Sequence, residues 1–156
     1  MNRPNSSMQL TRAADYGVRV MIHLATAPTN GRHSLSQLAK AADAPESFLS
    51  KVLQALVRAG MIESRRGQAG GFEISQLGVQ ATIRAVIEAV DGPVRLNLCL
   101  VEGRPCHRQS WCPAHPVWAR AQRAMFAVLE EATVAELAGP STACTNGDTG
   151  ANLCMP

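Results

Sequence analysis

The sequence has few aromatic residues, no long apolar run and no catalytic motif, and each absence narrows the class of protein. Aromatic residues make up 4% of the 156 residues, whereas hydrophobic residues make up 46%. The core must therefore be built from Ala, Leu, Val and Ile, a composition that favours helices. We expect a mainly helical protein, because this length suffices for one compact domain with a dimerisation element but not for a second full domain.

No apolar run approaches the roughly 20 residues that cross a bilayer, and the N-terminal stretch lacks the pattern of a secretion signal. We therefore expect a cytoplasmic protein with no membrane partner. The five cysteines are an odd number, which argues against a framework of structural disulfides and favours reduced thiols. No nucleophile–base pairing or phosphate-cradling motif is present, so we expect no enzymatic activity.

Basic charge is concentrated in the N-terminal half of the chain. Residues 1–70 hold nine Arg or Lys and four Asp or Glu, a balance of +5, whereas residues 71–156 hold six and eight, a balance of −2. This asymmetry indicates that the first half meets a polyanion. A solvated basic face without a partner is the alternative.

Apolar spacing and helix-end signals predict three helices in the first half, over residues 11–26, 34–43 and 45–60. Ser34 and Gln37 form a capping box at the start of the second helix. The first helix carries an apolar stripe made of Leu10, Ala14, Val18, Ile22 and Ala25. The third carries a face predicted to be buried, made of Phe48, Leu49, Val52, Leu53, Leu56 and Val57.

A β-hairpin is expected after the third helix. Its strands cover residues 61–64 and 72–74, and the glycine-rich turn between them begins with Arg65 and Arg66. Two short helices with a tight turn, a polar second helix and a basic hairpin are typical of a winged helix-turn-helix. The alternative is a structural three-helix core with a solvated polar face.

The polar face of the third helix supplies candidate contacts to DNA. Such a helix can enter the major groove, while basic residues of the hairpin reach the minor groove or the backbone. The predicted DNA-binding residues are Ser47, Phe48, Ser50, Lys51, Gln54, Arg65 and Arg66.

Three cysteines, Cys99, Cys106 and Cys112, lie in a loop over residues 96–113 and are followed by His115. Soft thiolate ligands gathered in one loop suit an iron–sulfur cluster or zinc. Because six and five residues separate the successive cysteines, more than zinc knuckles prefer, the spacing favours a 2Fe-2S or 4Fe-4S cluster. A zinc site made of the three cysteines and His115 stays open, as does a thiol switch or a set of inert cysteines without metal.

A cluster with three thiolates needs a fourth ligand, and a weaker ligand would let small molecules or oxidants reach iron. His115 is close in sequence, Asp15 could approach through folding or from a second subunit, and His107 is a further candidate. His115 as a helix-start residue and Asp15 as a solvated carboxylate are the ordinary alternatives.

Two further helices and a tail complete the chain. Residues 83–90 form a helix before the loop, and a longer helix from His115 carries a stripe of Trp118, Ala121, Met125, Val128 and Leu129 that suits core or dimer packing. Thr133 and Glu136 cap a short last helix. Residues 139–156 are predicted to be a disordered tail, and we assign no role to its Cys144 and Cys154.

Several segments resemble the IscR/NsrR type of bacterial winged-helix regulators (Rrf family) over residues 8–138. The matching segments are Met8-Gln9-Leu10-Thr11 with Asp15-Tyr16-Gly17, Arg66-Gly67 through Gly70-Gly71, Ala89-Val90-Asp91-Gly92, and Thr133-Val134-Ala135-Glu136-Leu137. The resemblance implies a homodimeric transcription regulator in which the state of a cluster held by Cys99, Cys106 and Cys112 controls DNA binding. It also implies a choice of fourth ligand, since Asp15 matches an aspartate that nitric-oxide-sensing members supply from the partner subunit and His115 matches the histidine of cluster-homeostasis members.

The expected protein is mainly α, a winged helix-turn-helix with a small β-hairpin wing, a cysteine loop and a long C-terminal dimerisation helix. The expected units are a DNA-binding domain over residues 8–75, the loop and dimerisation helices over 76–138, and the tail. We expect a homodimer that binds double-stranded operator DNA, most simply as a repressor, and whose cluster senses nitric oxide, redox or iron status. The alternatives are a cluster-free thiol-switch or zinc-binding repressor, and a metal or redox storage protein whose basic half is incidental.

Overall fold

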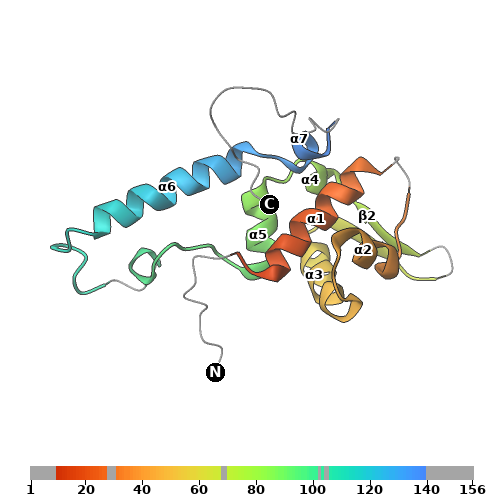
Figure 1. Ribbon diagram of the computed structural model, residues 1–156, viewed down its shortest axis with the longest axis horizontal. Helices are drawn as coiled ribbons and strands as arrows, with labels where there is room; N and C mark the ends of the chain where they lie inside the picture. The colour runs from red at the N-terminus through yellow and green to blue at the C-terminus, as the bar shows by residue number, and fades with distance from the viewer. Residues whose placement is uncertain (1–9, 28–30, 68–69, 102, 104–105, 140–156) are drawn as a thin grey trace.

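The computed structural model describes residues 10–27, 31–67, 70–101, 103 and 106–139. Its elements are α1 (Arg12–Thr26), α2 (Leu35–Ala42), α3 (Glu46–Arg58), β1 (Ile62–Arg65), β2 (Gly71–Ile74), α4 (Gln76–Val79), α5 (Ile83–Asp91), the 3₁₀ turn η1 (Leu98–Leu100), α6 (His115–Glu131) and α7 (Val134–Ala138). Figure 1 shows a body made of α1–α5, α7 and the hairpin, from which α6 projects as an arm. The predicted mainly helical winged-helix fold is confirmed. The predicted tail after residue 139 lies outside the described residues.

Side-chain caps lie at the starts of α1 and α2, each within one residue of the predicted start. The hydroxyl of Thr11 accepts a hydrogen bond from the amide of Ala14 at the start of α1, at 3.1 Å. Ser34 and Gln37 form both bonds of the predicted capping box before α2. Asp43 then ends α2 in the left-handed conformation, at φ 53°, and so makes the tight turn between α2 and α3.

The helix α1 lies at the centre of the body, where it packs against α2, α3, α5 and α7 (Figure 1). Its most buried residues are Ala14, Gly17, Val20, Met21 and Leu24. The predicted stripe was therefore partly wrong, since Leu10 precedes the helix and is 56% exposed. Gly17, which the predicted stripe left out, lies on the buried face, and a Cβ there would lie 3.1 Å from Val90 Cγ2 of α5. A glycine that allows two helices to approach closely has no apolar side chain, so the spacing of apolar residues does not reveal it.

The hairpin has the predicted position, and three of its four strand ends differ from the prediction by one residue. The strands β1 and β2 pair antiparallel, with Ile62 opposite Ile74 and Arg65 opposite Gly71. The sequence missed α4, the short helix that follows β2. Ser75 caps α4 and also donates from its hydroxyl to the carbonyl of Gly60, at 2.6 Å, so α4 is attached to the end of α3.

The base of the wing is attached to the segment before α2. His33 and Phe72 exchange two backbone hydrogen bonds, of 3.0 and 2.9 Å. Next to them the Arg32 guanidinium donates to both carboxylate oxygens of Glu73, at 3.1 and 2.9 Å. A bidentate pair of this kind fixes orientation as well as distance. The wing therefore leaves the body at a defined angle.

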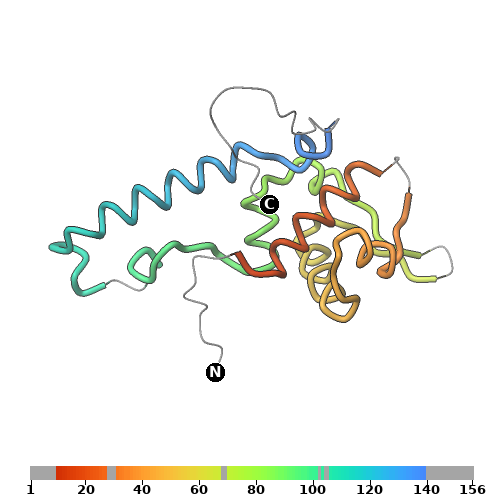
Figure 2. Tube along the Cα trace, viewed as in Figure 1, coloured from red at the N-terminus to blue at the C-terminus, as the bar shows by residue number. Residues whose placement is uncertain are grey.

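Backbone hydrogen bonds connect the last part of the chain to the start of α5. The amide of Ile83 donates to the carbonyl of Ala132, and that of Val134 donates to Ala81, each at 2.9 Å. Val134 of α7 is fully buried in the same core as α1, α3 and α5. Figure 2 shows the chain leaving α5, running out through the cysteine loop, and returning along α6 to this junction.

Candidate nucleic-acid interface and cysteine loop

The helix α3 presents a polar face because its other face is held in the core. Leu49, Leu53 and Leu56 have no exposed surface, and Val52 is almost as deeply buried. The residues left outside include four of the predicted DNA contacts, Ser47, Phe48, Lys51 and Gln54, which are exposed, and Ser50, which is half-buried. These five side chains therefore lie on the accessible side of one helix.

Phe48 corrects part of the prediction for α3, which placed it on the buried face. Its side chain is 41% exposed and meets the ring of Tyr16 edge-on, with centroids 5.8 Å apart. The ring sits one helical turn before Val52, at the margin of the core, and is covered on one side by α1. An exposed aromatic edge in this place is suited to contact a thymine methyl group in the major groove.

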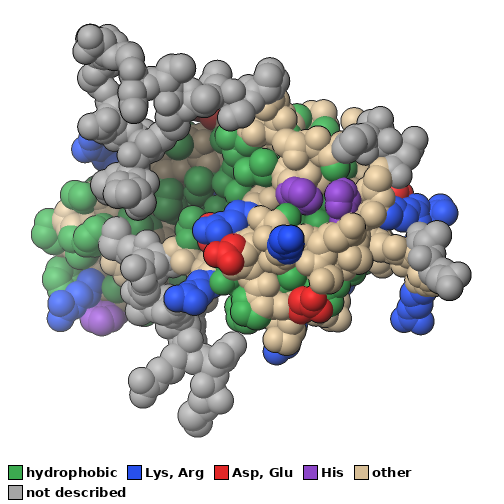
Figure 3. Space-filling model, turned by 45° about the vertical axis from the view of Figure 1, so that its right-hand side comes forward, with side chains coloured by type: hydrophobic (Ala, Val, Ile, Leu, Met, Phe, Trp, Pro, Cys, Tyr) green, Lys and Arg blue, Asp and Glu red, His purple; other side chains and the backbone are tan. Residues whose placement is uncertain are grey.

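Arg65 and Arg66 lie at the free end of the hairpin and are both exposed. Residues 68 and 69 of the same turn lie outside the described residues. Figure 3 shows basic side chains standing out at the end of the molecule that carries the wing. The accessible face of α3 and the wing arginines thus provide hydrogen-bonding and cationic groups on the same part of the chain.

The sequence did not indicate a hollow of about 640 Å³ beside the helix-turn-helix. It lies between the first turns of α1, the helix α2 and the start of α3, and is open to solvent. Arg12 and Lys40 contribute positive charge to its lining, whereas Asp43 and Glu46 contribute negative charge. The balanced charges give the hollow no preference for an anion.

The cysteine loop consists of successive turns with few contacts to the body. Backbone hydrogen bonds join Cys106 to Gln109, Arg108 to Cys112, and Cys112 to His115, over 2.8 to 3.2 Å. The last of these turns leads directly into α6, so Cys112 and His115 lie at the N-terminal end of that helix. Cys99 lies apart from them in η1.

The predicted ligands are available but are not assembled within one chain. Cys99, Cys106 and Cys112 are free thiols, each half-buried. Among the described residues, no three His, Cys, Asp or Glu side chains come close enough together to hold a metal ion. The ligand set therefore stays a prediction.

The candidate fourth ligands lie in different places. Asp15 is on α1, where its carboxylate pairs with the Arg19 guanidinium at 2.8 Å. Arg19 also donates to the carbonyl of Ala42 at the end of α2. His115 has a buried Nδ1 with no hydrogen-bond partner in the described part of the chain, whereas His107 is exposed. Three reduced thiols and an unpartnered imidazole nitrogen make a donor set whose chemistry fits an iron–sulfur cluster.

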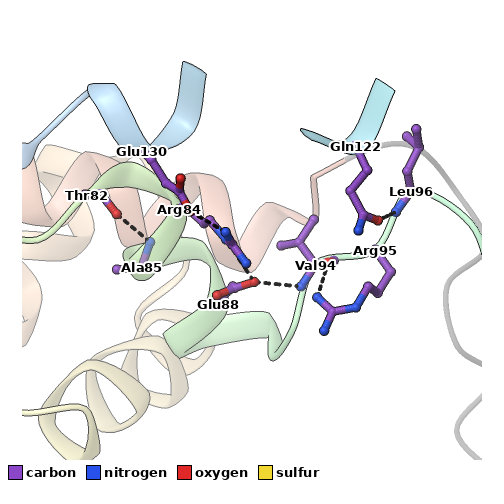
Figure 4. A network of polar contacts seen from close by, with 9 residues as sticks. All are labelled: Thr82, Arg84, Ala85, Glu88, Val94, Arg95, Leu96, Gln122 and Glu130. Carbon is purple, nitrogen blue, oxygen red and sulfur yellow. Dashed lines mark hydrogen bonds and ion pairs between the residues drawn. The ribbon is translucent and has the colours of Figure 1, made fainter. Parts of the chain in front are cut away.

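A polar network, which the sequence did not indicate, attaches the loop to the body (Figure 4). Arg84 of α5 pairs with Glu88 and with Glu130 of α6, and its guanidinium lies 3.7 Å from the ring centroid of Phe126. Glu88 also accepts from the amide of Val94, at 3.3 Å. One arginine thus joins α5, α6 and, through Glu88, the entry of the loop.

A second contact lies farther along α6. The side-chain oxygen of Gln122 accepts from the amide of Leu96, at 3.0 Å (Figure 4). Long-range pairs such as Arg84–Glu130 leave no periodic signal in a single sequence, which is why the sequence reading missed them. Both hydrogen bonds to the loop lie before Cys99 in the sequence, and η1, which contains Cys99, also contacts α6.

The helix α6 has no fully buried residue, although it carries a run of apolar side chains. Val117 is 57% exposed, Trp118 36% and Val128 65%. Val117, Ala121, Ala124 and Val128 are spaced by four, three and four residues and are all exposed. This is the spacing of a seam between two packed helices. No helix among the described residues has the length and apolar character needed to cross a membrane.

Comparison with known proteins identifies the family. Residues 10–140 match the model of the Rrf2 family, described as iron-dependent transcriptional regulators. The HTH-type transcriptional regulator Rv1287 of Mycobacterium tuberculosis is 32% identical over 132 residues, covering 85% of this chain and 82% of that protein. The regulator NsrR of Halalkalibacterium halodurans is 30% identical over 131 residues, covering 83% and 90%.

A solved structure agrees with the family match. The structure of CymR, titled the global cysteine regulator of Bacillus subtilis, has a TM-score of 0.66 and 26% identity, covering 85% of this chain and 97% of that one. Its likeness extends over the winged helix-turn-helix and the long helix alike, since almost the whole of its chain is covered. The exposed polar face of α3, the basic wing and these matches together show that the chain belongs to the Rrf2 family of winged-helix, DNA-binding transcription regulators.

Proposed function

We propose that this protein is a homodimeric regulator whose binding to operator DNA is controlled by an iron–sulfur cluster held by Cys99, Cys106 and Cys112. The observation that carries the proposal is the placement of three free thiols on a loop that is fastened to both α5 and α6 at its entry. The likeness to NsrR supports it. Repression is the simplest form of control, because a dimer on an operator blocks access to the DNA beneath it.

The DNA-binding half consists of α3 and the wing, within the proposed domain over residues 8–75. The polar residues Ser47, Ser50, Lys51 and Gln54 would face base edges or phosphates in the major groove, and Phe48 would supply an apolar contact. Arg65 and Arg66 would lie on the adjacent backbone or minor groove. A dimer places two such units on half-sites about one helical turn apart.

The arm formed by α6 is the proposed dimer contact, and a second copy of this chain is its occupant. The seam of Val117, Ala121, Ala124 and Val128 has no partner among the described residues, and the helix projects away from the body (Figure 1). Two copies of the same seam are self-complementary, as a two-fold interface requires. Burying it would remove exposed valine and alanine side chains from water.

Replacing Val128 by Glu should convert the dimer to monomers, because a charge would be buried in an apolar seam. Sedimentation velocity at micromolar protein is the measurement. Ala127→Glu is the matched control, since residue 127 is also exposed but lies outside the seam. Equal dimer content in Val128→Glu and the parent would show that α6 is not the interface.

The chain itself supplies a path from the loop to the DNA-binding face. Glu88 and Gln122 hold the entry of the loop, α5 packs on α1, and α1 packs on α3. The close approach of Gly17 and Val90 makes the α1–α5 contact tight, so the two helices move as a unit. When bound, a cluster supplies a link among the cysteines that oxidants or nitric oxide can break.

His115 and Asp15 remain the two candidates for the fourth ligand, with His107 third. His115 is favoured within one chain, because its unpartnered Nδ1 lies one turn after Cys112. Asp15 would have to exchange its pairing with Arg19 and reach a loop of the partner subunit. Because Arg19 also holds the end of α2, such an exchange would bear directly on the helix-turn-helix.

A cluster-free thiol switch is the second candidate function. It is favoured by the free state of all three loop cysteines and by the fold of CymR, the regulator of cysteine in Bacillus subtilis. The other cluster-free alternative is a zinc site made of the loop cysteines and His115. These proteins would bind the operator yet lack visible colour.

The test is the visible spectrum of protein purified without oxygen, together with iron and acid-labile sulfide assays. We expect a brown protein with iron and sulfide in near-equal amounts, and a colourless triple variant with Cys99, Cys106 and Cys112 changed to Ala. The double variant Cys144→Ala with Cys154→Ala is the control and should keep its colour. The proposal is wrong if the triple variant binds the operator as tightly as the parent and responds equally to nitric oxide or oxygen.

A further inference from the structure

Two histidines far from the cysteine loop lie together where the wing joins the body. His23 is in the last turn of α1 and His33 is in the segment before α2, and their ring centroids are 5.1 Å apart at an interplanar angle of 73°. Figure 3 shows such a pair of histidine side chains side by side at the molecular surface. Neither residue has a part in the proposed cluster site or in the proposed contacts to DNA.

One ring nitrogen of this pair has no hydrogen-bond partner among the residues that the structure describes. Nε2 of His33 is buried, and no hydrogen-bond partner for it lies in the described part of the chain. Buried polar atoms are nearly always paired, so an unpaired nitrogen facing a crowded site requires an explanation. A bound cation that accepts the lone pair of this nitrogen is such an explanation, whereas edge-to-face packing of the two rings leaves the lone pair unused.

We propose that His23 and His33 form a two-histidine site for a divalent late transition metal such as Zn²⁺, with water completing the coordination. A metal bound to one nitrogen of each ring, at about 2.0–2.1 Å and a tetrahedral angle, holds the two ring centres roughly 5 Å apart. The observed separation already matches this arrangement. Imidazole is a ligand that zinc, copper and nickel share.

The surroundings agree with the proposed site. Burial, and secondly the proximity of His33, lower the pKa of His23, which favours the neutral form of its ring. Neutral imidazole is the form that binds metal. The positive charge of the neighbouring Arg32 is paired with the carboxylate of Glu73 through two hydrogen bonds, so Arg32 adds no unpaired positive charge beside the site.

A metal in this place would connect three elements. His23 belongs to α1, and His33 exchanges backbone hydrogen bonds with Phe72 of β2. The bound ion would therefore fasten the base of the wing to the central helix of the body. The proposed two-histidine site is separate from the cysteine loop, and the proposal does not depend on the presence of an iron–sulfur cluster.

The experiment is a titration of the full-length protein with Zn²⁺, followed through the imidazole signals of the four histidines in ¹H–¹⁵N spectra. His23→Phe keeps an aromatic ring in place but removes the ligand, and His107→Phe is the control in the cysteine loop. We expect Zn²⁺ to shift the His23 and His33 signals of the parent and of the control. In His23→Phe the apparent Kd read from His33 should weaken at least about tenfold, as losses of even outer-sphere partners do.

Thermal denaturation gives a second readout. Zn²⁺ should raise the melting temperature of the parent, and part of this rise should be absent in His23→Phe but present in His107→Phe. The inference is overturned if Zn²⁺ shifts only the signals of His107 or His115. It is also overturned if the apparent Kd read from the His33 signal weakens less than about tenfold in His23→Phe, or if that variant keeps the full Zn²⁺-induced rise in melting temperature. His23 is half-buried on a helix surface, so this variant tests the site even if His33→Phe does not fold.

Discussion

Raising the salt concentration from 50 to 200 mM should weaken operator binding by roughly three to five decades if six to ten phosphates are neutralised. The reason is the net charge of +5 on residues 1–70, which hold nine Arg or Lys and four Asp or Glu. Fluorescence anisotropy with a labelled operator at several salt concentrations measures the slope. A metal or redox storage protein would have no such operator, so a flat salt response would favour that class.

The wing arginines allow a sharper form of this prediction. Changing Arg65 and Arg66 together to Ala should reduce the slope of log affinity against log salt by about 2, one for each lost phosphate contact. The charge-matched control changes Arg120 and Arg123 of α6, both exposed and on the arm. If the control reduces the slope as much as the wing variant does, general charge rather than the wing accounts for the effect.

Changing Gly78 to Ala should destabilise the fold by about 3 kcal/mol, a large value for a single methyl group. A Cβ at this position would lie 2.0 Å from the carbonyl oxygen of Met61 and 2.9 Å from Ile74 Cγ1. Both neighbours belong to the base of the wing, and the nearer one is backbone that cannot turn aside. Chemical denaturation measures the change, and the melting temperature should fall by about 10 °C.

Gly67→Ala is the matched control for the added methyl group. A Cβ at Gly67 meets nothing within 4 Å, so this variant carries only the strain of its φ of 108°. We expect it to cost about 1 kcal/mol. If Gly78→Ala costs no more than Gly67→Ala, α4 can shift away from β1 and the tight contact does not stabilise the wing.

The ends of the helices could be predicted from the sequence because the signals are local. The predicted capping boxes of Ser34 and Thr133 connect residues three apart, and such motifs need no knowledge of the rest of the fold. At the last of these, a hydrogen bond from the backbone of Thr133 lowers the pKa of Glu136. The same reasoning located the hairpin, since glycines and alternation both mark it.

The features missed from the sequence depend on contacts between distant segments. Arg84 finds Glu130 and Phe126 only once α6 has returned to α5, and Gly17 is recognised only once Val90 lies against it. Phe48 was assigned to the core by its helical position, but Tyr16 covers only one side of it. No periodic pattern in a single sequence carries this information.

The cysteine loop lies between these two cases. Residue type and spacing identify Cys99, Cys106 and Cys112 as candidate ligands, because thiol chemistry is a property of the residues themselves. Their arrangement is not a property of the loop alone, since the large apolar side chains Leu98 and Trp111 are exposed and form no core within it. In the proposed function, a bound group or a second copy of the chain would bring the three cysteines together.

The long helix α6 also works as a lever. Its base is joined to α5 by the two backbone hydrogen bonds around Ala132, whereas its other end carries Cys112 and His115. A helix of 17 residues is about 25 Å long, so a rotation of about 5° at the base moves the tip by about 2 Å. Because a lever acts in both directions, a rearrangement of that size among the cysteines corresponds to a small rotation of the body. In the proposed dimer, the chemistry of the loop would thus change the angle between the two DNA-binding units, and the spacing of operator half-sites is sensitive to that angle.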